Sequence, residues 1–400
     1  MPDKSELKGK LELLMFQTTS FCNIACKYCY LADTNTKKRI SIDTIRKTIE
    51  NLLFDNLIGS VLNIVWHFGE PLTVPVSYYI EIHNVIAEIL PSNISVNYFF
   101  QTNATLIDHE WCSFFKSFNT NICVSIDGPQ FVNDFNRTDR NNNSTYAKAY
   151  RGINLLTQNN IRFTAISVIS NNSLQYYKEL YDFFSELNIV KWGINFEQKL
   201  GSNLVSSLYT ETTNEQEDIN IHEFLKNIFN YHIKANKKVK IREFAIAKSN
   251  LLNLPVDYYF KNENLSQLIY PFKIVSVDAM GNFSTFTPDL IDQKHHGYGD
   301  FLLGNVQEIG FIESTETDKF KFMYSTIMEG IEVCKANCKY FFVCGGGCPA
   351  SKYSEHRTFN TSDTKFCTYT RKYPFDIILN ELENALTIEI EKQTHHAFLT

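Results

Sequence analysis

The sequence predicts an α/β fold, in which a partial (β/α)6 barrel precedes a smaller cysteine-rich domain. Two observations predict this class. Short runs rich in β-branched and aromatic residues alternate six times with amphipathic stretches, which is typical of a parallel sheet with right-handed crossovers. Eight of the ten cysteines then fall into two groups, one near each end of the chain. Six such units favour an open barrel over a closed eight-stranded one.

The strands and helices of this barrel can be placed along the chain. The predicted strands are 11–17, 61–68, 94–101, 121–127, 162–169 and 191–197. Between them, 41–55, 77–90, 145–158 and 173–187 place apolar residues three or four apart, and several of these segments open on a Ser or Thr cap. In parallel barrels the functional residues gather at the carboxyl ends of the strands, so we expect the site there.

The composition excludes several classes of function. The chain has 400 residues, 44% of them hydrophobic, and a net charge of -6, which gives no basic field for nucleic acid. No run of about 18 apolar residues predicts a membrane span, and the start does not resemble a secretory signal. We therefore expect a cytoplasmic protein. In that compartment, cysteines are more often ligands or buried thiols than disulfides.

The segment CNIACKYCY places Cys22, Cys26 and Cys29 on a loop directly after the first strand. Thiolates at this spacing can face one iron-sulfur cluster, and three ligands would leave one iron of a [4Fe-4S] centre open. The alternative is a zinc site closed by His67, at the end of the second strand. Cys112 and Cys123 lie in apolar surroundings and are interpreted as buried core thiols.

This loop resembles the CxxxCxΦC signature of radical S-adenosylmethionine (SAM) enzymes, with Tyr28 at the aromatic position. In that family the open iron binds the amino and carboxylate groups of SAM. HFGEPL, residues 67–72, is similar to the family's GGEP motif, although Phe68 replaces its first glycine. The resemblance implies that Gly69 and Glu70 receive the SAM amino group.

Two further segments extend the resemblance. QTNATLI and VSIDGP are similar to family segments at the ends of strands three and four. They imply that Gln101, Asn103, Ser125 and Asp127 line the cofactor and substrate mouth, and Arg137 matches an arginine that often meets the SAM carboxylate. From the residues alone, Asn103 and Asp127 could also be turn residues.

The C-terminal cysteines have the spacing CxxxCx5CxxxC and are followed by a fifth cysteine. This spacing resembles that of SPASM domains, which bind auxiliary iron-sulfur clusters. The upstream cysteines of the first SPASM cluster are missing here, which implies one auxiliary [4Fe-4S] cluster. By the same resemblance its ligands are Cys334, Cys338, Cys344 and Cys367, and Cys348 is free; a set that includes Cys348 stays possible. The alternative is a zinc ribbon, which would leave one cysteine without a role.

GNFSTFTPDL and YFFVCGGGCP resemble segments of GRRM- and XYE-type peptide maturases, which form cyclophanes on ribosomally made precursors. The resemblance implies that a 5′-deoxyadenosyl radical takes hydrogen from a Cβ, which then bonds to an aromatic ring. Phe286 occupies the position of a lost cysteine, and Thr287 that of the catalytic aspartate of sulfatase-maturating relatives. Asp278 and Asp289 are the nearest candidates for a catalytic base, or they are turn or surface carboxylates.

These interpretations divide the chain into a radical SAM barrel (1–200), a bridging region (201–270), a SPASM-like domain (271–372) and a C-terminal helix and tail (373–400). The expected partners are a precursor peptide and a reductant such as flavodoxin or ferredoxin, with no nucleic acid and no membrane. Formylglycine or thioether formation is the alternative reaction. An alternative of another class is a non-catalytic iron-sulfur or zinc protein.

Overall fold

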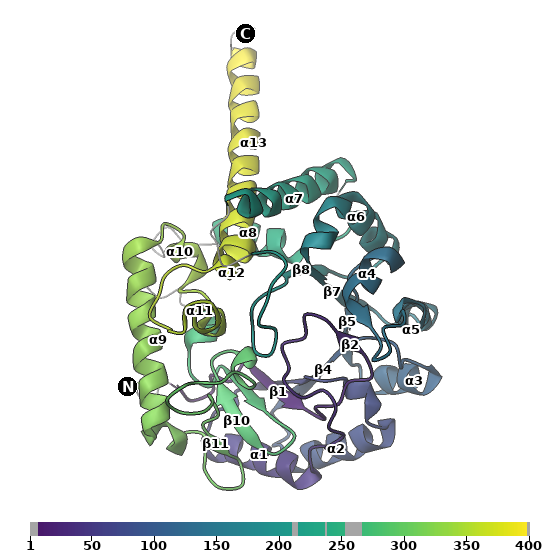
Figure 1. The fold of residues 1–400 in the computed structure, drawn as a ribbon, viewed down its shortest axis with the longest axis vertical. Helices are drawn as coiled ribbons and strands as arrows, with labels where there is room; N and C mark the ends of the chain where they lie inside the picture. The colour runs from purple at the N-terminus through teal and green to yellow at the C-terminus, as the bar shows by residue number, and fades with distance from the viewer. Residues whose placement is uncertain (1–6, 210–214, 237, 253–265, 398–400) are drawn as a thin grey trace.

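The computed structural model of the chain describes residues 7–209, 215–236, 238–252 and 266–397. Its main feature is a nine-stranded sheet with the order β11-β10-β9-β1-β3-β4-β5-β7-β8 (Figure 1). Six of these strands run parallel in chain order from β1 to β8. They are β1 (Leu13–Gln17), β3 (Val61–His67), β4 (Ser95–Thr102), β5 (Asn121–Ser125), β7 (Phe163–Ile169) and β8 (Trp192–Phe196). The prediction of a six-stranded open barrel is confirmed.

Helices connect these strands and cover the outside of the sheet (Figure 1). They are α1 (Ile42–Phe54), α2 (Val76–Ile89), α3 (His109–Ser117), α4 (Gln130–Asn136), α5 (Tyr146–Gln158) and α6 (Tyr177–Glu186). Side-chain caps fix where some of them begin. The Ser41 side chain accepts a hydrogen bond from the Thr44 backbone before α1, and the Asp108 side chain caps α3 in the same way.

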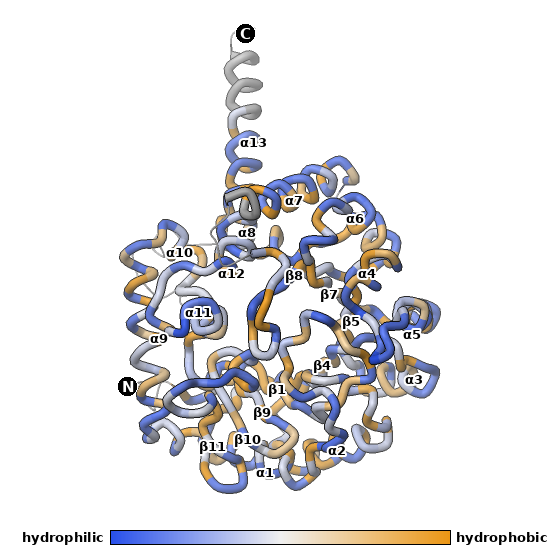
Figure 2. The backbone as a smooth tube through the Cα atoms, viewed as in Figure 1, coloured by the Kyte–Doolittle hydropathy of each residue, from blue (hydrophilic) through white to orange (hydrophobic). Residues whose placement is uncertain are grey.

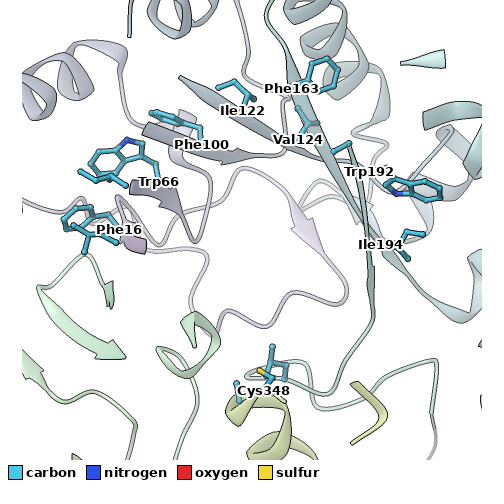
Figure 3. Close-up of a cluster of buried hydrophobic side chains, with 14 of the residues drawn as sticks. Phe16, Trp66, Phe100, Ile122, Val124, Phe163, Trp192, Ile194 and Cys348 are labelled. Atoms are coloured by element: carbon cyan, nitrogen blue, oxygen red, sulfur yellow. The ribbon is translucent and has the colours of Figure 1, made fainter. Parts of the chain in front are cut away.

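The two faces of each barrel strand have different environments. In β3, Leu62, Ile64 and Trp66 are fully buried, whereas the alternate residues are exposed or only partly buried. Trp66 packs edge-on against Tyr79 of α2, so the buried face meets the helices. Figure 3 shows such side chains on successive strands, and Figure 2 shows that apolar segments gather along the strands. The other face is therefore left to line the inside of the barrel.

The second half of the chain continues the same sheet. β9 (Ile274–Val277) pairs parallel with β1, and β10 (Asn282–Thr285) and β11 (Gly304–Asn305) follow as antiparallel strands. The predicted cysteine-rich domain thus begins inside the barrel sheet. Its helices are α9 (Asp318–Asn337), α10 (Phe341–Cys344), α11 (Pro349–His356) and α12 (Lys365–Cys367). The domain boundaries at 200, 270 and 372 stay a prediction.

Three helices lie outside these two parts. α7 (Glu215–Lys234) and α8 (Arg242–Leu252) lie in the predicted bridging region, and its residues 253–265 lie outside the described ones. α13 (Tyr373–Ala397) confirms the predicted C-terminal helix; Ile377 and Ile378 are buried near its start, and its far end extends away from the body (Figure 1). No helix in the described ranges combines the length and apolar character needed to cross a membrane.

Candidate active site

A cavity of about 400 Å³ opens at the carboxyl ends of the barrel strands. Its size is in the range of small-molecule sites. All three N-terminal cysteines line it, together with residues from the ends of β3, β4, β5 and β8. The predicted site residues on its wall are Cys22, Cys26, Tyr28, Cys29, Gly69, Glu70, Gln101, Asn103, Ser125, Arg137 and Asp289. Side chains distant in sequence therefore meet in one cavity.

The cysteine loop is fixed against the HFGEPL segment by a close backbone contact. Gly69 has φ +66°, and a Cβ on it would lie 2.5 Å from the carbonyl oxygen of Thr19. Since no side chain fits there, glycine is required at this position. The next residue, Glu70, donates its backbone N–H to the carbonyl oxygen of Phe21, at 2.9 Å. This contact positions Cys22, the first thiol.

A second contact brings a cation to the loop. β2 (Ala25–Cys26) pairs antiparallel with β6 (Arg137–Thr138), so Arg137 lies beside Cys26, with Nη1 3.8 Å from Sγ. Arg137 Nε donates to Asp127 Oδ1 at 2.9 Å, and the Tyr28 hydroxyl donates to Asp127 Oδ2 at 2.6 Å. Both members of this ion pair are buried. Asp127 is thus not on the cavity wall; it holds Arg137 and Tyr28 in place.

Glu70 is buried at the end of β3 and its carboxylate is held by three hydrogen bonds. It accepts from the backbone of Leu72, from the Thr102 hydroxyl at 2.8 Å and from the backbone of Asn103 at 2.8 Å. Burial raises the pKa of Glu70 to about 7. A carboxylate in this state is stabilised by a cationic group on a ligand, such as an ammonium.

Other polar side chains complete the wall. Gln101 Nε2 donates to Ser125 Oγ at 2.6 Å, and Asn103 Nδ2 donates to Asn23 at 2.9 Å. His67 also lines the cavity, and its Nδ1 is sealed from solvent with no hydrogen-bond partner in the described part of the chain. Burial lowers the pKa of His67 to about 4, so the imidazole is neutral at pH 7. His67 is thus positioned to meet a ligand in the cavity.

The chemistry of the donors fits an iron-sulfur cluster. All ten cysteines are free thiols. Burial raises the pKa of Cys22 and of Cys26 to about 12, so these thiols ionise only when a cation compensates the charge, as iron does. Across the described ranges, no three His, Cys, Asp or Glu side chains are arranged to hold a single metal ion. The three N-terminal cysteines all line the same cavity.

Four C-terminal cysteines surround a second, much smaller hollow of about 20 Å³. They are Cys334, Cys338, Cys344 and Cys367. The glycines 345–347 all have positive φ, which turns the chain sharply after Cys344. Cys348 does not line this hollow; it directly precedes α11, its Sγ lies 3.8 Å from the Thr287 hydroxyl, and Figure 3 shows it apart from the strands. The arrangement supports the predicted four-cysteine set without Cys348.

The two candidate bases lie in different places. The Asp278 carboxylate accepts hydrogen bonds from the backbones of Met280 and Asn282 and from the Asn282 side chain, so it stabilises the turn between β9 and β10. Asp289 lines the cavity, and burial raises its pKa to about 6. Its Oδ2 accepts from the Thr287 hydroxyl at 3.3 Å. The geometry favours Asp289.

Part of the cavity wall was not predicted from the sequence. Asn195, Glu197 and Gln198 line it at the end of β8, and Phe366 reaches it from α12. The signal for the first three was available, since they lie at the carboxyl end of the sixth predicted strand or directly after it. Phe366 could not be predicted, because only the folded arrangement of the C-terminal part brings it there.

A family model for the radical SAM superfamily matches residues 16–184, which include the cysteine loop and most of the barrel, from the end of β1 to α6. This chain belongs to the radical SAM superfamily. A Synechocystis protein of uncharacterized function is 32% identical over 382 residues, which is 94% of each chain. A serine-type anaerobic sulfatase-maturating enzyme of Bacteroides thetaiotaomicron is 24% identical, over 83% of this chain and 81% of that enzyme.

Solved structures share the fold. The enzyme anSMEcpe with bound AdoMet superposes with a TM-score of 0.73 at 21% identity, covering 93% of this chain and 94% of that chain. Streptococcus suis SuiB bound to its precursor peptide SuiA gives a TM-score of 0.64 at 13% identity, covering 91% of this chain and 77% of that chain. Radical SAM enzymes use a [4Fe-4S] cluster and SAM, so both are cofactors of this chain.

Proposed function

We propose that this radical SAM enzyme modifies a ribosomally made precursor peptide by joining the Cβ of one residue to the aromatic ring of another. The observation that carries the proposal is the position of Asp289. A buried carboxylate from the cysteine-rich part reaches the cavity that holds the three N-terminal thiols. Such a crosslink removes one hydrogen atom, one proton and one electron from the peptide, and each needs an acceptor.

The residues of the chain would divide this work. Cys22, Cys26 and Cys29 would hold the first cluster, and Glu70 and Arg137 would bind the amino and carboxylate groups of SAM. Asp289 would accept the proton when the ring regains aromaticity. When bound, the first cluster and SAM supply a radical that takes hydrogen from carbon, and an auxiliary cluster supplies an acceptor for the electron.

The C-terminal cysteines support one auxiliary cluster in this scheme. We propose Cys334, Cys338, Cys344 and Cys367 as its ligands, because all four line one hollow. The expected peptide partner is supported by the structural likeness to SuiB bound to SuiA. A flavodoxin or ferredoxin as the reductant stays part of the proposal.

Anaerobic sulfatase maturation is the second candidate, favoured by relatives with that name. The two reactions can be separated by coexpressing the enzyme with a small precursor peptide encoded beside its gene, followed by tandem mass spectrometry. We expect a loss of two hydrogens and fragments that join a Cβ to an aromatic ring. An aldehyde that reacts with a hydrazide, or a cysteine thioether, would reject the cyclophane assignment. Cys26→Ala is the control without modification.

A further inference from the structure

A buried lysine touches the C-terminal cysteine site. Lys352 lies on α11, and the residue is only 3% exposed to solvent. Its Nζ is 3.2 Å from Cys334 Sγ and donates to the carbonyl oxygen of Gly330 at 3.0 Å. A lysine is seldom buried without a partner of opposite charge. The contact with Cys334 therefore needs an explanation in terms of charge.

No carboxylate contacts Lys352 within the part of the chain that the structure describes. A buried ammonium with a single carbonyl partner is unfavourable by several kcal/mol, on the order of the effective penalty for burying one ion. A set of metal-bound thiolates carries the negative charge that would remove this penalty. The cysteines around the hollow are the nearest source of such charge.

The other cations near this site differ from Lys352. Arg371 and Lys372 also line the hollow. Arg371 is only partly buried, so water screens its charge, and the Nζ of Lys372 lies 2.7 Å from the Asp363 carboxylate, which already balances it. At the first site, Arg137 is likewise paired, with Asp127. Cys334 is the ionisable side chain that contacts Lys352. The anion that balances this buried cation is therefore a cysteine thiolate.

We propose that Lys352 is the counter-cation of the C-terminal cysteines and raises the reduction potential of the auxiliary cluster. This inference rests on the proposed auxiliary cluster. Reduction adds one negative charge to a cluster, and a fixed positive charge in a buried, low-dielectric site stabilises the reduced form more than the oxidised form. An unpaired cation 3.2 Å from a ligand sulfur would make this cluster a better electron acceptor than the first one.

The test uses full-length protein in which Cys22, Cys26 and Cys29 are replaced by Ala, so that only the C-terminal cluster contributes to the spectra. Lys352→Met keeps the length of the side chain and removes its charge; Lys352→Arg keeps the charge. Lys372→Met is the matched control, because it removes a cation that Asp363 already balances. Each protein is reconstituted anaerobically, its iron is counted, and its midpoint potential is measured by redox titration followed by EPR.

We expect Lys352→Met to make reduction at least tenfold less favourable, which is a fall of about 59 mV for a one-electron couple. Lys352→Arg should stay close to the parent, and Lys372→Met should change the potential less than Lys352→Met. An unchanged potential in Lys352→Met, with the cluster in place, would overturn the role of Lys352 alone. A parent protein that binds no iron would overturn the auxiliary cluster as well.

Loss of the cluster is also informative. If Lys352→Met and Lys352→Gln bind no cluster whereas Lys352→Arg does, the positive charge is needed to hold the thiolates, which supports the counter-cation role. If Lys352→Arg fails together with both neutral variants, the site requires the shape of lysine rather than its charge, and the proposal is wrong.

Discussion

The two cysteine sites of this protein use the same ligand in different surroundings. The N-terminal site has three thiols on a cavity of about 400 Å³, and the cation beside it, Arg137, is paired with Asp127. The C-terminal site has four thiols around a hollow of about 20 Å³ and an unpaired buried cation, Lys352. The number of thiols and the room beside them decide whether a substrate can reach the metal; the nearby charges decide which site favours an added electron.

The largest effect is expected from removing a thiol of the open site. Cys26→Ala should abolish formation of 5′-deoxyadenosine, because a cluster with two protein ligands is no longer held beside SAM. The iron content should fall by about four per chain, the content of one [4Fe-4S] cluster. Both quantities are measured after anaerobic reconstitution. If the variant still cleaved SAM, the open site would lie elsewhere.

The closed site can be tested with a matched pair of variants. Cys344→Ala should lose about four irons, whereas Cys348→Ala should keep them, because Cys348 does not line the hollow. SAM cleavage should persist in both, and product formation should fall in Cys344→Ala only. Equal iron loss in the two variants would instead support a ligand set that includes Cys348.

The proposed base links the two sites and gives a pH-dependent prediction. Burial raises the pKa of Asp289 to about 6, so the carboxylate that can accept a proton is present above that pH and is lost as the pH falls through it. Product formation should therefore rise with pH through about 6. Asp289→Asn should reduce the rate of product formation by a factor of about 10² to 10⁴ and abolish its rise with pH, while 5′-deoxyadenosine is still released.

Asp278→Asn is the control for Asp289→Asn. The Asp278 side chain is engaged in the turn between β9 and β10, and product formation with this variant should keep the same pH dependence as the unmodified enzyme. If Asp278→Asn lost product formation and Asp289→Asn did not, Asp278 would be the base and Asp289 would not.

The smallest effect is expected at the paired charges of the first site. Tyr28→Phe removes the hydrogen bond to Asp127 and should lower the free energy of unfolding by about 1.5 kcal/mol, as for a bond to a charged acceptor. Tyr30→Phe is the matched control, since Tyr30 belongs to the same loop and lines the same cavity as Tyr28. Urea titrations of the cluster-free proteins measure both. Equal losses in the two variants would contradict a special role for Tyr28.

The barrel was predictable because its signal is local. Each of the six parallel strands is a short apolar run, and amphipathic helices connect them along the chain, so hydrophobic periodicity predicts both. The addition of β9 to the edge of β1 was not predictable, since its four residues, Ile274–Val277, could pair with several partners. Long-range pairing of this kind is decided by the complete fold.

The two cysteine sites were also only partly predictable from the sequence. The cysteine spacing predicted both thiol groups, and the structure gathers the three N-terminal cysteines around one cavity and four of the five C-terminal ones around a second hollow. Sequence could not choose between Asp278 and Asp289, because both follow short strands and both could be turn residues. Lys352 gave no signal either, since a lysine four residues after a cysteine is expected on a helix surface, and only the packing of α11 beside α9 buries it.

The most direct test of the difference between the two sites is EPR of each reduced cluster with and without SAM. One sample retains only the N-terminal cluster, through Cys344→Ala, and the other retains only the C-terminal cluster, through replacement of Cys22, Cys26 and Cys29 by Ala. We predict that SAM changes the spectrum of the first sample and leaves that of the second unchanged. An unchanged first spectrum, or a SAM-dependent change in the second, would contradict an open site at the start of the chain and a closed one at its end.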